Sequence, residues 1–155
     1  MNSRYIVAGV IRDGENIVLG KKAKGEMPYP DVWHTPGGGA EDFETAKRLF
    51  DEKDYDNEFF HNELRRELRE ETNLEVKNIK NIVPTYRDKP REAETKNHNG
   101  EMTHFYFLEY VCDYDSGELK AGDDLAEVQW VEKKGLKNFS LTPPSEEMYK
   151  ELGWI

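Results

Sequence analysis

The apolar residues of this chain follow two spacings, one helical and one strand-like, and the clearest helical stretch covers residues 57–72. Phe60, Leu64 and Leu68 recur every four residues, so at a helical rotation they fall within about 80° of one another and predict a buried stripe. No glycine or proline interrupts the stretch, and its Glu, Leu and Arg residues favour helices. Asn73 follows, and Asn readily takes the left-handed conformation that ends many helices. A long amphipathic helix is therefore predicted to end beside Asn73.

The charged residues of this helix are segregated. Glu63, Glu67 and Glu71 are four residues apart, and Glu70 lies beside them within an arc of roughly 100°. The three arginines are expected on the other side: Arg65, Arg66 and Arg69. Neighbouring like charges cost a few tenths of a kcal/mol each, so the ladder suits a hard divalent cation, which takes carboxylate oxygens. The alternative is an ordinary charged surface helix, with Arg66 and Glu70 as its one favourable i, i+4 pair.

Apolar runs rich in β-branched residues predict the strands. Residues 5–11 and 17–20 flank an Asp-Gly turn and predict a hairpin. Residues 103–112 are almost continuously apolar, which predicts a central strand. Further strands are predicted at residues 75–85 and 127–131. The prolines at positions 143 and 144 predict the start of a final helix, with Thr142 or Ser145 as its N-cap.

Polar segments connect these elements. Residues 41–58 are very acidic and are predicted to form a short helix and a loop, whereas residues 25–31 are predicted to form a loop. Residues 87–101 carry both charges and are predicted to be the longest and most mobile loop. The order strands, helix, strands, helix predicts a mixed α/β layered domain.

Composition favours a soluble single-domain protein. The chain has 155 residues, enough for one sizeable core, and its eight Tyr, seven Phe and three Trp exclude a disordered chain. The net charge of −10 argues against binding nucleic acid polymers or anionic membranes. Cys112 is the single cysteine, so no internal disulfide can form, and the four histidines lack the spacing of a Cys/His metal site. With no signal peptide or long apolar run, a cytoplasmic protein is the default expectation.

A glycine run precedes the main helix. Pro36 is followed by three glycines, which allow positive φ and a close approach of the backbone to a ligand. Together, the run and the helix resemble the Nudix (MutT-like) hydrolase family. Residues 66–74, RELREETNL, match the second half of the Nudix box at eight of nine positions, and Gly38 followed six residues later by Glu44 fits its opening. The resemblance covers most of the chain and implies an α/β fold, a Nudix-like α/β/α sandwich with a mixed, partly antiparallel sheet.

The sequence departs from the box in two places. Between Glu44 and Arg66 there are 21 residues where the box has seven, an excess of 14. We therefore expect a single Nudix hydrolase domain with an insertion around residues 42–61, which could form a flap over the pocket or a contact in a homodimer. Glu58 lies eight residues before Arg66 and is the alternative to Glu44 as the first box glutamate. Asn73 replaces the box glycine, which the fold should tolerate because Asn adopts the left-handed conformation at modest cost.

The resemblance implies metal-dependent chemistry. Glu67, Glu70, Glu71 and the backbone carbonyl of Gly38 would hold one to three Mg²⁺ or Mn²⁺ ions. Such ions neutralise a di- or triphosphate and lower the pKa of a bound water for attack on phosphorus. An acidic protein could then handle an anionic substrate.

The catalytic set implied by the resemblance is Glu70, Glu67 and Arg66. Glu70 is the first choice for the general base. The alternatives come from the segment 87–101: Glu92, Glu94 and Glu101. Arg66 is expected to support the loop through a carboxylate, and Glu63, which the box does not assign, is predicted to lie near the metals as an auxiliary ligand.

The implied substrate is a nucleoside diphosphate derivative. A short chain favours a nucleoside triphosphatase that releases pyrophosphate. The alternative is an ADP-ribose or nucleotide-sugar pyrophosphatase. Pro90 is faintly similar to a proline that follows the box in ADP-ribose hydrolases. Candidate contacts with the substrate are Gly37, Gly38 and the aromatic residues Trp33, Phe139 and Tyr29. The short basic cluster Lys21, Lys22 and Lys24 could be solvated lysines at the end of a strand or could face a phosphate. The aromatic residues could stack on a base, although core or rim positions suit them better.

A protein of another class, a non-catalytic Nudix-like nucleotide sensor, stays open. The intact glutamates argue against it, because a sensor does not need the full ladder of like charges. A nucleotide-type small molecule is the expected partner in either case, with no nucleic acid polymer and no membrane.

Overall fold

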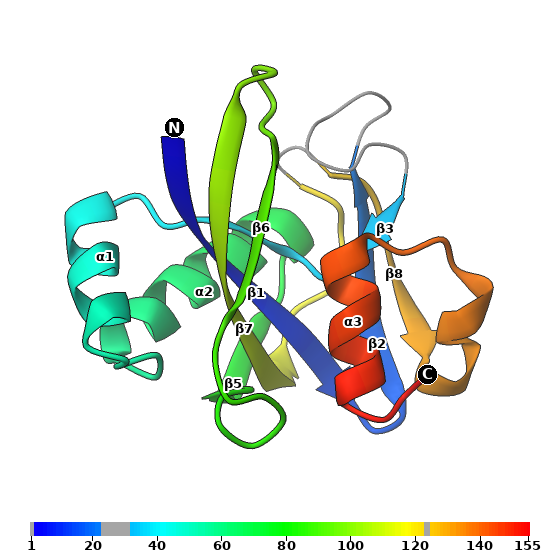
Figure 1. The fold of residues 1–155 in the computed structure, drawn as a ribbon. Coiled ribbons are helices and arrows are strands. Elements are labelled where there is room, and N and C mark those ends of the chain that lie inside the picture. The colour runs from blue at the N-terminus through cyan, green and yellow to red at the C-terminus, as the bar shows by residue number, and fades with distance from the viewer. Residues whose placement is uncertain (1, 23–31, 123–124) are drawn as a thin grey trace.

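The computed structural model describes residues 2–22, 32–122 and 125–155, and its elements form three layers (Figure 1). Within these ranges, eight strands form one mixed sheet. Helices α1 (Phe43–Asp51) and α2 (Glu58–Thr72) cover one face, and α3 (Pro143–Glu151) covers the other. This α/β/α sandwich confirms the predicted fold class.

Two long parallel strands form the centre of the sheet. β1 (Asn2–Asp13) and β7 (Met102–Ser116) are paired from Asn2↔Thr103 to Arg12↔Asp113. β7 also pairs in antiparallel fashion with β5 (Glu75–Asn81) and β6 (Arg91–Lys96). The near-continuous apolar run of β7 therefore matches its central position, as predicted.

The remaining strands extend the sheet beyond β1. β2 (Asn16–Lys22) follows β1 through a tight turn and pairs with β3 (Trp33–His34) and β8 (Leu125–Glu132). β4 (Gly37–Gly39) pairs in antiparallel fashion with β1. After β8, the chain forms a 3-10 helix, η1 (Lys133–Asn138), and enters α3.

The helix ends follow the sequence signals. The Asn57 side chain accepts a hydrogen bond from the Phe59 amide and caps α2, and Asn73 ends this helix at φ 65° in the left-handed region. Thr142 caps α3, with prolines in its first turn, where a missing N–H costs nothing. The predicted helix boundaries and the role of Asn73 are confirmed.

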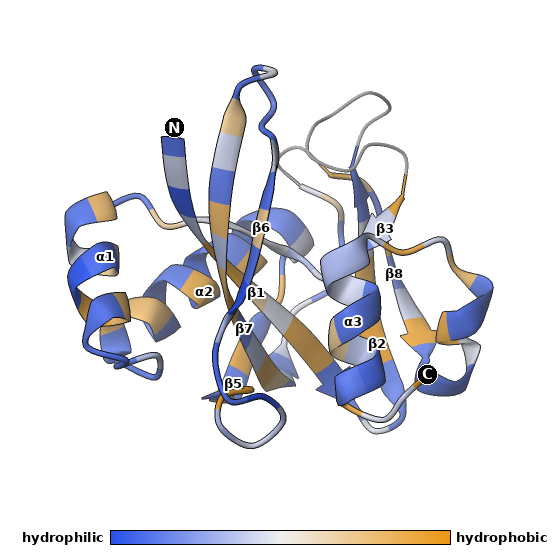
Figure 2. Ribbon diagram, viewed as in Figure 1, coloured by the Kyte–Doolittle hydropathy of each residue, from blue (hydrophilic) through white to orange (hydrophobic). Residues whose placement is uncertain are grey.

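Alternation along β1 divides the core into two clusters. Tyr5, Val7 and Ile11 pack with α1 and the fully buried stripe of α2, whereas Val10 packs with α3. Because successive side chains of a strand point to opposite faces, one strand contributes to both clusters. Figure 2 shows the apolar colour along the central strands and the striped helices that cover them. None of the described helices is long and apolar enough to cross a lipid bilayer.

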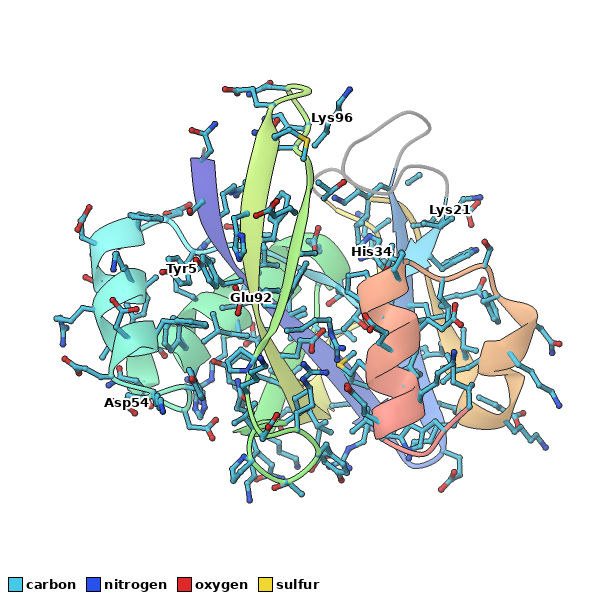
Figure 3. The ribbon with its side chains drawn as sticks, in the orientation of Figure 1. Tyr5, Lys21, His34, Asp54, Glu92 and Lys96 are labelled. Carbon is cyan, nitrogen blue, oxygen red and sulfur yellow. The ribbon has the colours of Figure 1, made fainter. Side chains whose placement is uncertain are left out.

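The prediction of a long mobile loop at residues 87–101 was wrong. This segment contains β6, which forms a hairpin with β7 through a turn organised by the Asn97 side chain, whose Oδ1 accepts from the amides of Asn99 and Glu101. Figure 3 shows Glu92 and Lys96 along this strand. Charged side chains are common on edge strands because they oppose aggregation. The apolar partner, β7, supplies the pairing that the polar sequence of β6 did not reveal.

The stripe of α2 provides a test of the core. Leu64→Ala should lower the free energy of unfolding by about 2–5 kcal/mol, because Leu64 is fully buried between α2 and β1 and its loss leaves a cavity. Asn62→Ala, at an exposed position of the same helix, should change it by less than about 0.5 kcal/mol. Urea denaturation of the two variants measures both values, and equal values would contradict the assigned face.

Candidate active site

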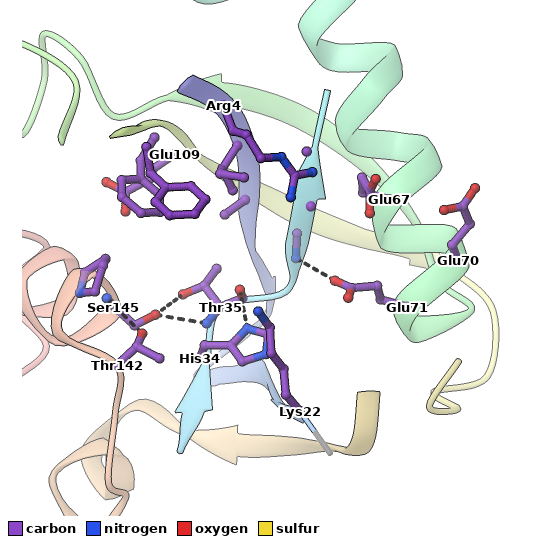
Figure 4. Close-up of a pocket in the computed structure, with 18 of the residues that line it drawn as sticks. Arg4, Lys22, His34, Thr35, Glu67, Glu70, Glu71, Glu109, Thr142 and Ser145 are labelled. Atoms are coloured by element: carbon purple, nitrogen blue, oxygen red, sulfur yellow. Dashed lines mark hydrogen bonds between the residues drawn. The ribbon is translucent and has the colours of Figure 1, made fainter. Parts of the chain in front are cut away.

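A cavity of about 490 Å³ lies between α2, the central strands and the first turn of α3 (Figure 4). Seven candidates from the sequence line it: Lys22, Gly37, Gly38, Arg66, Glu67, Glu70 and Glu71. The helix and the glycine run that were linked by their sequence pattern therefore meet at one place.

The glycines act through close packing. A Cβ atom on Gly37 would lie 2.1 Å from the Val7 carbonyl oxygen, and one on Gly38 would lie 2.3 Å from a carboxylate oxygen of Glu67. The Gly37 amide donates to Glu71 Oε1 at 2.7 Å. Neither glycine has positive φ, so the expected freedom of conformation is not used. The absence of side chains on these glycines instead allows α2 to pack closely against β4.

The C-terminal end of α2 is held by the segment before β8. The amides of Lys120 and Gly122 donate to the carbonyls of Thr72 and Glu71, at 3.0 and 3.1 Å, and the Asn73 side chain donates to the Glu118 carbonyl. Carbonyls at a helix end need such partners. These bonds fix the last turn of α2, from which Glu70 and Glu71 project.

Arg66 lies among the glutamates, so its expected position on the far side of the helix was wrong. It pairs with Glu63 at 3.1 Å, with Glu67 and Glu70 at 3.2 Å, and with Glu41 at 3.4 Å. Arg66 follows Glu63 by three residues and precedes Glu70 by four, which are spacings of neighbours on one face. Arg65 and Arg69 pair elsewhere, with Glu58 and Glu75.

The electrostatics of this cluster favour a charged Arg66. Burial opposes its charge, but Glu63, Glu67 and Glu41 raise the pKa of the guanidinium above its usual value. Glu67 and Glu71 are buried, at 8% and 3% exposure, whereas 45% of the Glu70 side chain is exposed. Glu70 is therefore the member of the set most accessible to water.

Glu63 connects α2 to the loop that follows the glycine strand. Its two carboxylate oxygens accept from the Glu41 amide at 2.9 Å and from Arg66 Nε at 3.1 Å. It ties the loop after the glycines to the arginine of the cluster. Among the described residues, Glu63 does not line the cavity.

The floor of the cavity comes from the facing sides of β1 and β7. The register pairs Arg4 with Phe105, Ile6 with Phe107 and Ala8 with Glu109, and all six residues line the cavity. Arg4 projects over the glycine strand, as Figure 4 shows. The floor thus runs from a cation through apolar side chains to a carboxylate.

Glu109 belongs to a buried ionic network. Arg91 Nε donates to its two carboxylate oxygens at 3.2 and 3.3 Å, and Arg91 also pairs with Glu151 of α3. Burial raises the pKa of Glu109 to about 7, against the opposing effect of Arg91. The network joins β6, β7 and α3 behind the cavity.

Hydrogen bonds also join α3 to the glycine strand. The Thr35 amide donates to Ser145 Oγ at 3.0 Å, and the Thr35 and Tyr149 hydroxyls are 2.7 Å apart. His34 Nδ1 donates to the Thr35 carbonyl at 2.8 Å. These bonds fix the third wall of the cavity, which includes His34, Thr35, Thr142 and Ser145.

Several candidates lie away from the cavity. Trp33 and Phe139 pack on each other edge to face, with centroids 5.5 Å apart, in the core under α3. The other candidates that do not line it, within the part of the chain described, are Glu44, Glu58, Glu92, Glu94 and Glu101. Of the basic cluster, Lys22 lines the cavity and Lys21 lies over the Trp33 ring. Tyr29 and Lys24 lie outside the described residues.

Sequence reasoning missed the floor and the third wall. The missed residues of the floor are Arg4, Ile6, Ala8, Phe105, Phe107 and Glu109, and those of the third wall are His34, Thr35, Thr142 and Ser145. Alternation along the two central strands held a usable signal, since Arg4 and Glu109 interrupt otherwise apolar faces. Their pairing required the parallel register, which the sequence pattern did not provide.

The donor chemistry of α2 fits a divalent cation. Three carboxylates line one wall, and oxygen ligands of this kind suit Mg²⁺ and Mn²⁺. In the described ranges, however, no three acidic, His or Cys side chains stand ready around one point, because Glu67 and Glu70 pair with Arg66 and Glu71 accepts from Gly37. A cation would have to compete with these partners. The carboxylates therefore suit a divalent cation by their chemistry and by their position on one wall, but they are not already arranged around a single point.

The contact between β4 and β1 can be tested directly. Gly37→Ala should lower the free energy of unfolding by about 1–3 kcal/mol, because the new Cβ meets backbone atoms that cannot turn aside. Gly135→Ala is the control, since a Cβ there meets nothing within 4 Å and the residue has no positive φ. Denaturant titration compares the two, and an unchanged stability for Gly37→Ala would refute the close packing.

A family model described as the NUDIX domain matches residues 63–152. The chain resembles a MutT NUDIX hydrolase from Burkholderia pseudomallei (16% identity, 98% of this chain and 99% of that chain covered, TM-score 0.64). It also resembles the mutator MutT protein of Bacillus halodurans (16%, 95% and 80%, 0.66).

A third similar structure is the NUDIX domain of Shewanella oneidensis NrtR in complex with ADP ribose (14% identity, 98% of this chain and 87% of that chain covered, TM-score 0.65). At such identities the likeness concerns the fold alone. No protein with a curated description matches the sequence.

Proposed function

The chain belongs to the Nudix family, and on that premise we propose that it is a metal-dependent hydrolase that cleaves a pyrophosphate bond in a nucleoside diphosphate derivative. The whole chain would be one such domain, with residues 42–61 as an insertion. The observation that carries the proposal is the wall formed by Glu67, Glu70 and Glu71 beside the glycine strand, in a cavity that also has room for an organic group.

The metal would be held by the acidic wall. Glu67, Glu70, Glu71 and the Gly38 carbonyl are the proposed ligands for Mg²⁺ or Mn²⁺, because all four supply oxygen. When bound, the ion supplies charge neutralisation and a water of lowered pKa. Arg66 would keep the glutamates gathered on one wall, as its contacts with Glu67 and Glu70 support.

Glu70 is the proposed general base. It is the most exposed of the three glutamates, so it can reach a water molecule and pass the proton on to solvent. A base must lie within hydrogen-bond reach of the proton it removes. The alternatives Glu92 and Glu94 contact His104 on the surface, and Glu101 accepts a hydrogen bond from the exposed Asn2 side chain. None of these three lines the cavity, which supports the choice of Glu70.

Positive charge at the other side of the cavity would meet the phosphates. Arg4 reaches over the glycine strand, and Lys22 lines the opposite rim. A protein with a net charge of −10 repels an anionic substrate, and these local cations would offset that repulsion at the cavity. A nucleoside triphosphate, cleaved with release of pyrophosphate, is the first candidate substrate.

ADP ribose is the second candidate, supported by its presence in the similar NUDIX domain of Shewanella oneidensis NrtR. The alternative of another class is a nucleotide sensor without turnover. A panel of nucleoside triphosphates, ADP ribose and dinucleoside polyphosphates, assayed with Mg²⁺ for released phosphate or pyrophosphate, separates these cases. If the protein bound nucleotides but hydrolysed none of these compounds, the proposed hydrolase activity would be rejected in favour of the sensor.

Substitution of the acidic wall should abolish turnover. Glu70→Gln and Glu71→Gln should each lower kcat by at least about 100-fold, the usual contribution of a proton-transfer group or more. Added Mg²⁺ should also raise the Tm of the wild type, because a ligand that binds only the folded state stabilises it, and this shift should shrink in Glu71→Gln. An Mg²⁺ shift unaffected by the substitution would place the metal elsewhere.

The two candidates for the first box glutamate provide the matched comparison. Glu44→Gln and Glu58→Gln should leave kcat/KM within about twofold of the wild type, because both side chains are exposed and lie away from the cavity. Glu63→Gln should lower it, since the Glu63 carboxylate braces Arg66. Steady-state kinetics decide, and a loss in Glu44→Gln or Glu58→Gln as large as that in Glu70→Gln would restore that residue to the site.

A further inference from the structure

The half of the cavity away from α2 has a different character from the acidic wall. Phe105, Phe107 and Glu109 follow one another on the same face of β7, and Ile6 and Ala8 lie beside them on β1. The proposed function assigns no role to this half, and the inference drawn from it rests on that function.

The register places this half at a suitable distance from the glycine strand. Gly37 pairs with Ala8 across one strand boundary, and Ala8 pairs with Glu109 across the next. Neighbouring strands are separated by about 4.8 Å, so Gly37 and Glu109 are roughly 10 Å apart along the hydrogen-bonding direction. A nucleotide with its phosphates beside β4 would therefore extend its base over Phe107 towards Glu109.

The floor between these points is flat and apolar. The Phe105 and Phe107 rings stack with centroids 6.2 Å apart and planes inclined by 28°. Phe105 is buried, whereas Phe107 is half-buried and presents its ring to the cavity. A partly exposed aromatic ring is a surface on which a planar base can stack.

Glu109 adds a fixed hydrogen-bond acceptor at the end of this floor. Arg91 Nε bonds to both of its oxygens, and Arg91 is itself held by Glu151 and lies near Glu147. An ionised carboxylate has about four acceptor positions, so the contacts with Arg91 leave acceptor capacity towards the cavity. The carboxylate cannot turn away, because its partner is buried and anchored.

We propose that Glu109, held in place by Arg91, determines substrate specificity by accepting two adjacent N–H donors from a base stacked on Phe107. Among the common nucleobases, guanine offers this pair, its ring N1–H and its 2-amino group. Adenine and cytosine present one amino group beside a ring acceptor, and uracil presents one N–H between two carbonyls. A lone pair or carbonyl facing the carboxylate is repelled, which disfavours these bases.

The wild-type protein alone provides the first test. At pH 8 with Mg²⁺, kcat/KM for GTP should exceed that for ITP, which lacks the 2-amino group, by roughly 10- to 100-fold, the discrimination usual for a two-donor contact. ATP and CTP should be no better than ITP. Equal values for GTP and ITP would overturn the inference and leave the hydrolase intact.

Two variants locate the effect. Glu109→Gln should raise KM for GTP and bring the GTP to ITP ratio close to one, because the amide has a single acceptor oxygen. Glu147→Gln is the matched control: it removes an exposed carboxylate 3.6 Å from Arg91, leaves the contacts of Arg91 with Glu109 and Glu151 in place and does not line the cavity, so the ratio should persist. A ratio lost equally in both variants would mean that the network acts through stability, which circular dichroism and Tm measure in parallel.

Binding without metal separates the two proposals. Calorimetry in EDTA should give tighter binding of GMP than of IMP to the wild type, by a factor of ten or more, and no such preference in Glu109→Gln. If no nucleotide is hydrolysed while the GMP preference holds, the proposed hydrolysis fails and the base site stands. If GMP and IMP bind equally, the base site fails whatever the hydrolysis shows.

Discussion

The close contact between the glycine strand and its two neighbours is the constraint on which the site depends. β4 lies near enough to β1 that a single methyl group on Gly37 would overlap the Val7 carbonyl, and near enough to α2 that one on Gly38 would overlap the Glu67 carboxylate. The Gly37 amide donates to Glu71 across the same gap. Dense packing of this kind leaves few alternative positions, so the glutamates are set by backbone geometry as much as by the helix.

The acidic wall is tolerable because its charges are partly balanced within the protein. Like charges at helical spacing are unfavourable, yet Glu63, Glu67 and Glu70 all approach Arg66. One guanidinium does not neutralise the whole set, which also includes Glu41 and Glu71. The remaining negative potential faces the cavity, where a cation or the positive end of a ligand complex would be stabilised.

Much of the fold was predictable, since it depends on local signals that agree with one another. The buried stripe of α2, the left-handed Asn73 and the proline-started α3 each follow from a few neighbouring residues. β6 was missed because its sequence is polar and its pairing comes from β7. A strand whose stability comes from its partner leaves little signal in its own composition.

The site divides in the same way. The glutamates of α2 lie within one short segment, as do the glycines of β4, and both groups could be identified from the sequence. Arg66 was placed on the wrong face, although its i, i+4 spacing from Glu70 already indicated a position beside that glutamate. Glu109 and Arg4 could not be assigned, since their placement in one cavity requires the parallel pairing of two strands about 100 residues apart. Trp33, for which a core or rim position was favoured over contact with a base, packs on Phe139 in the core.

The parallel pairing of β1 and β7 also explains how one cavity can have two chemistries. Alternation sends Tyr5 and Val7 into the core under α1 and α2, and sends Arg4, Ile6 and Ala8 to the cavity. The same rule on β7 places Phe105, Phe107 and Glu109 beside them in register. Shifting either strand by one residue would exchange core and cavity faces completely, so the recognition floor is tied to the stability of the sheet. The acidic wall, by contrast, belongs to a separate helix, α2, which contacts the sheet over β4. Substitutions on the floor could therefore change which ligand is recognised without moving the glutamates of the wall.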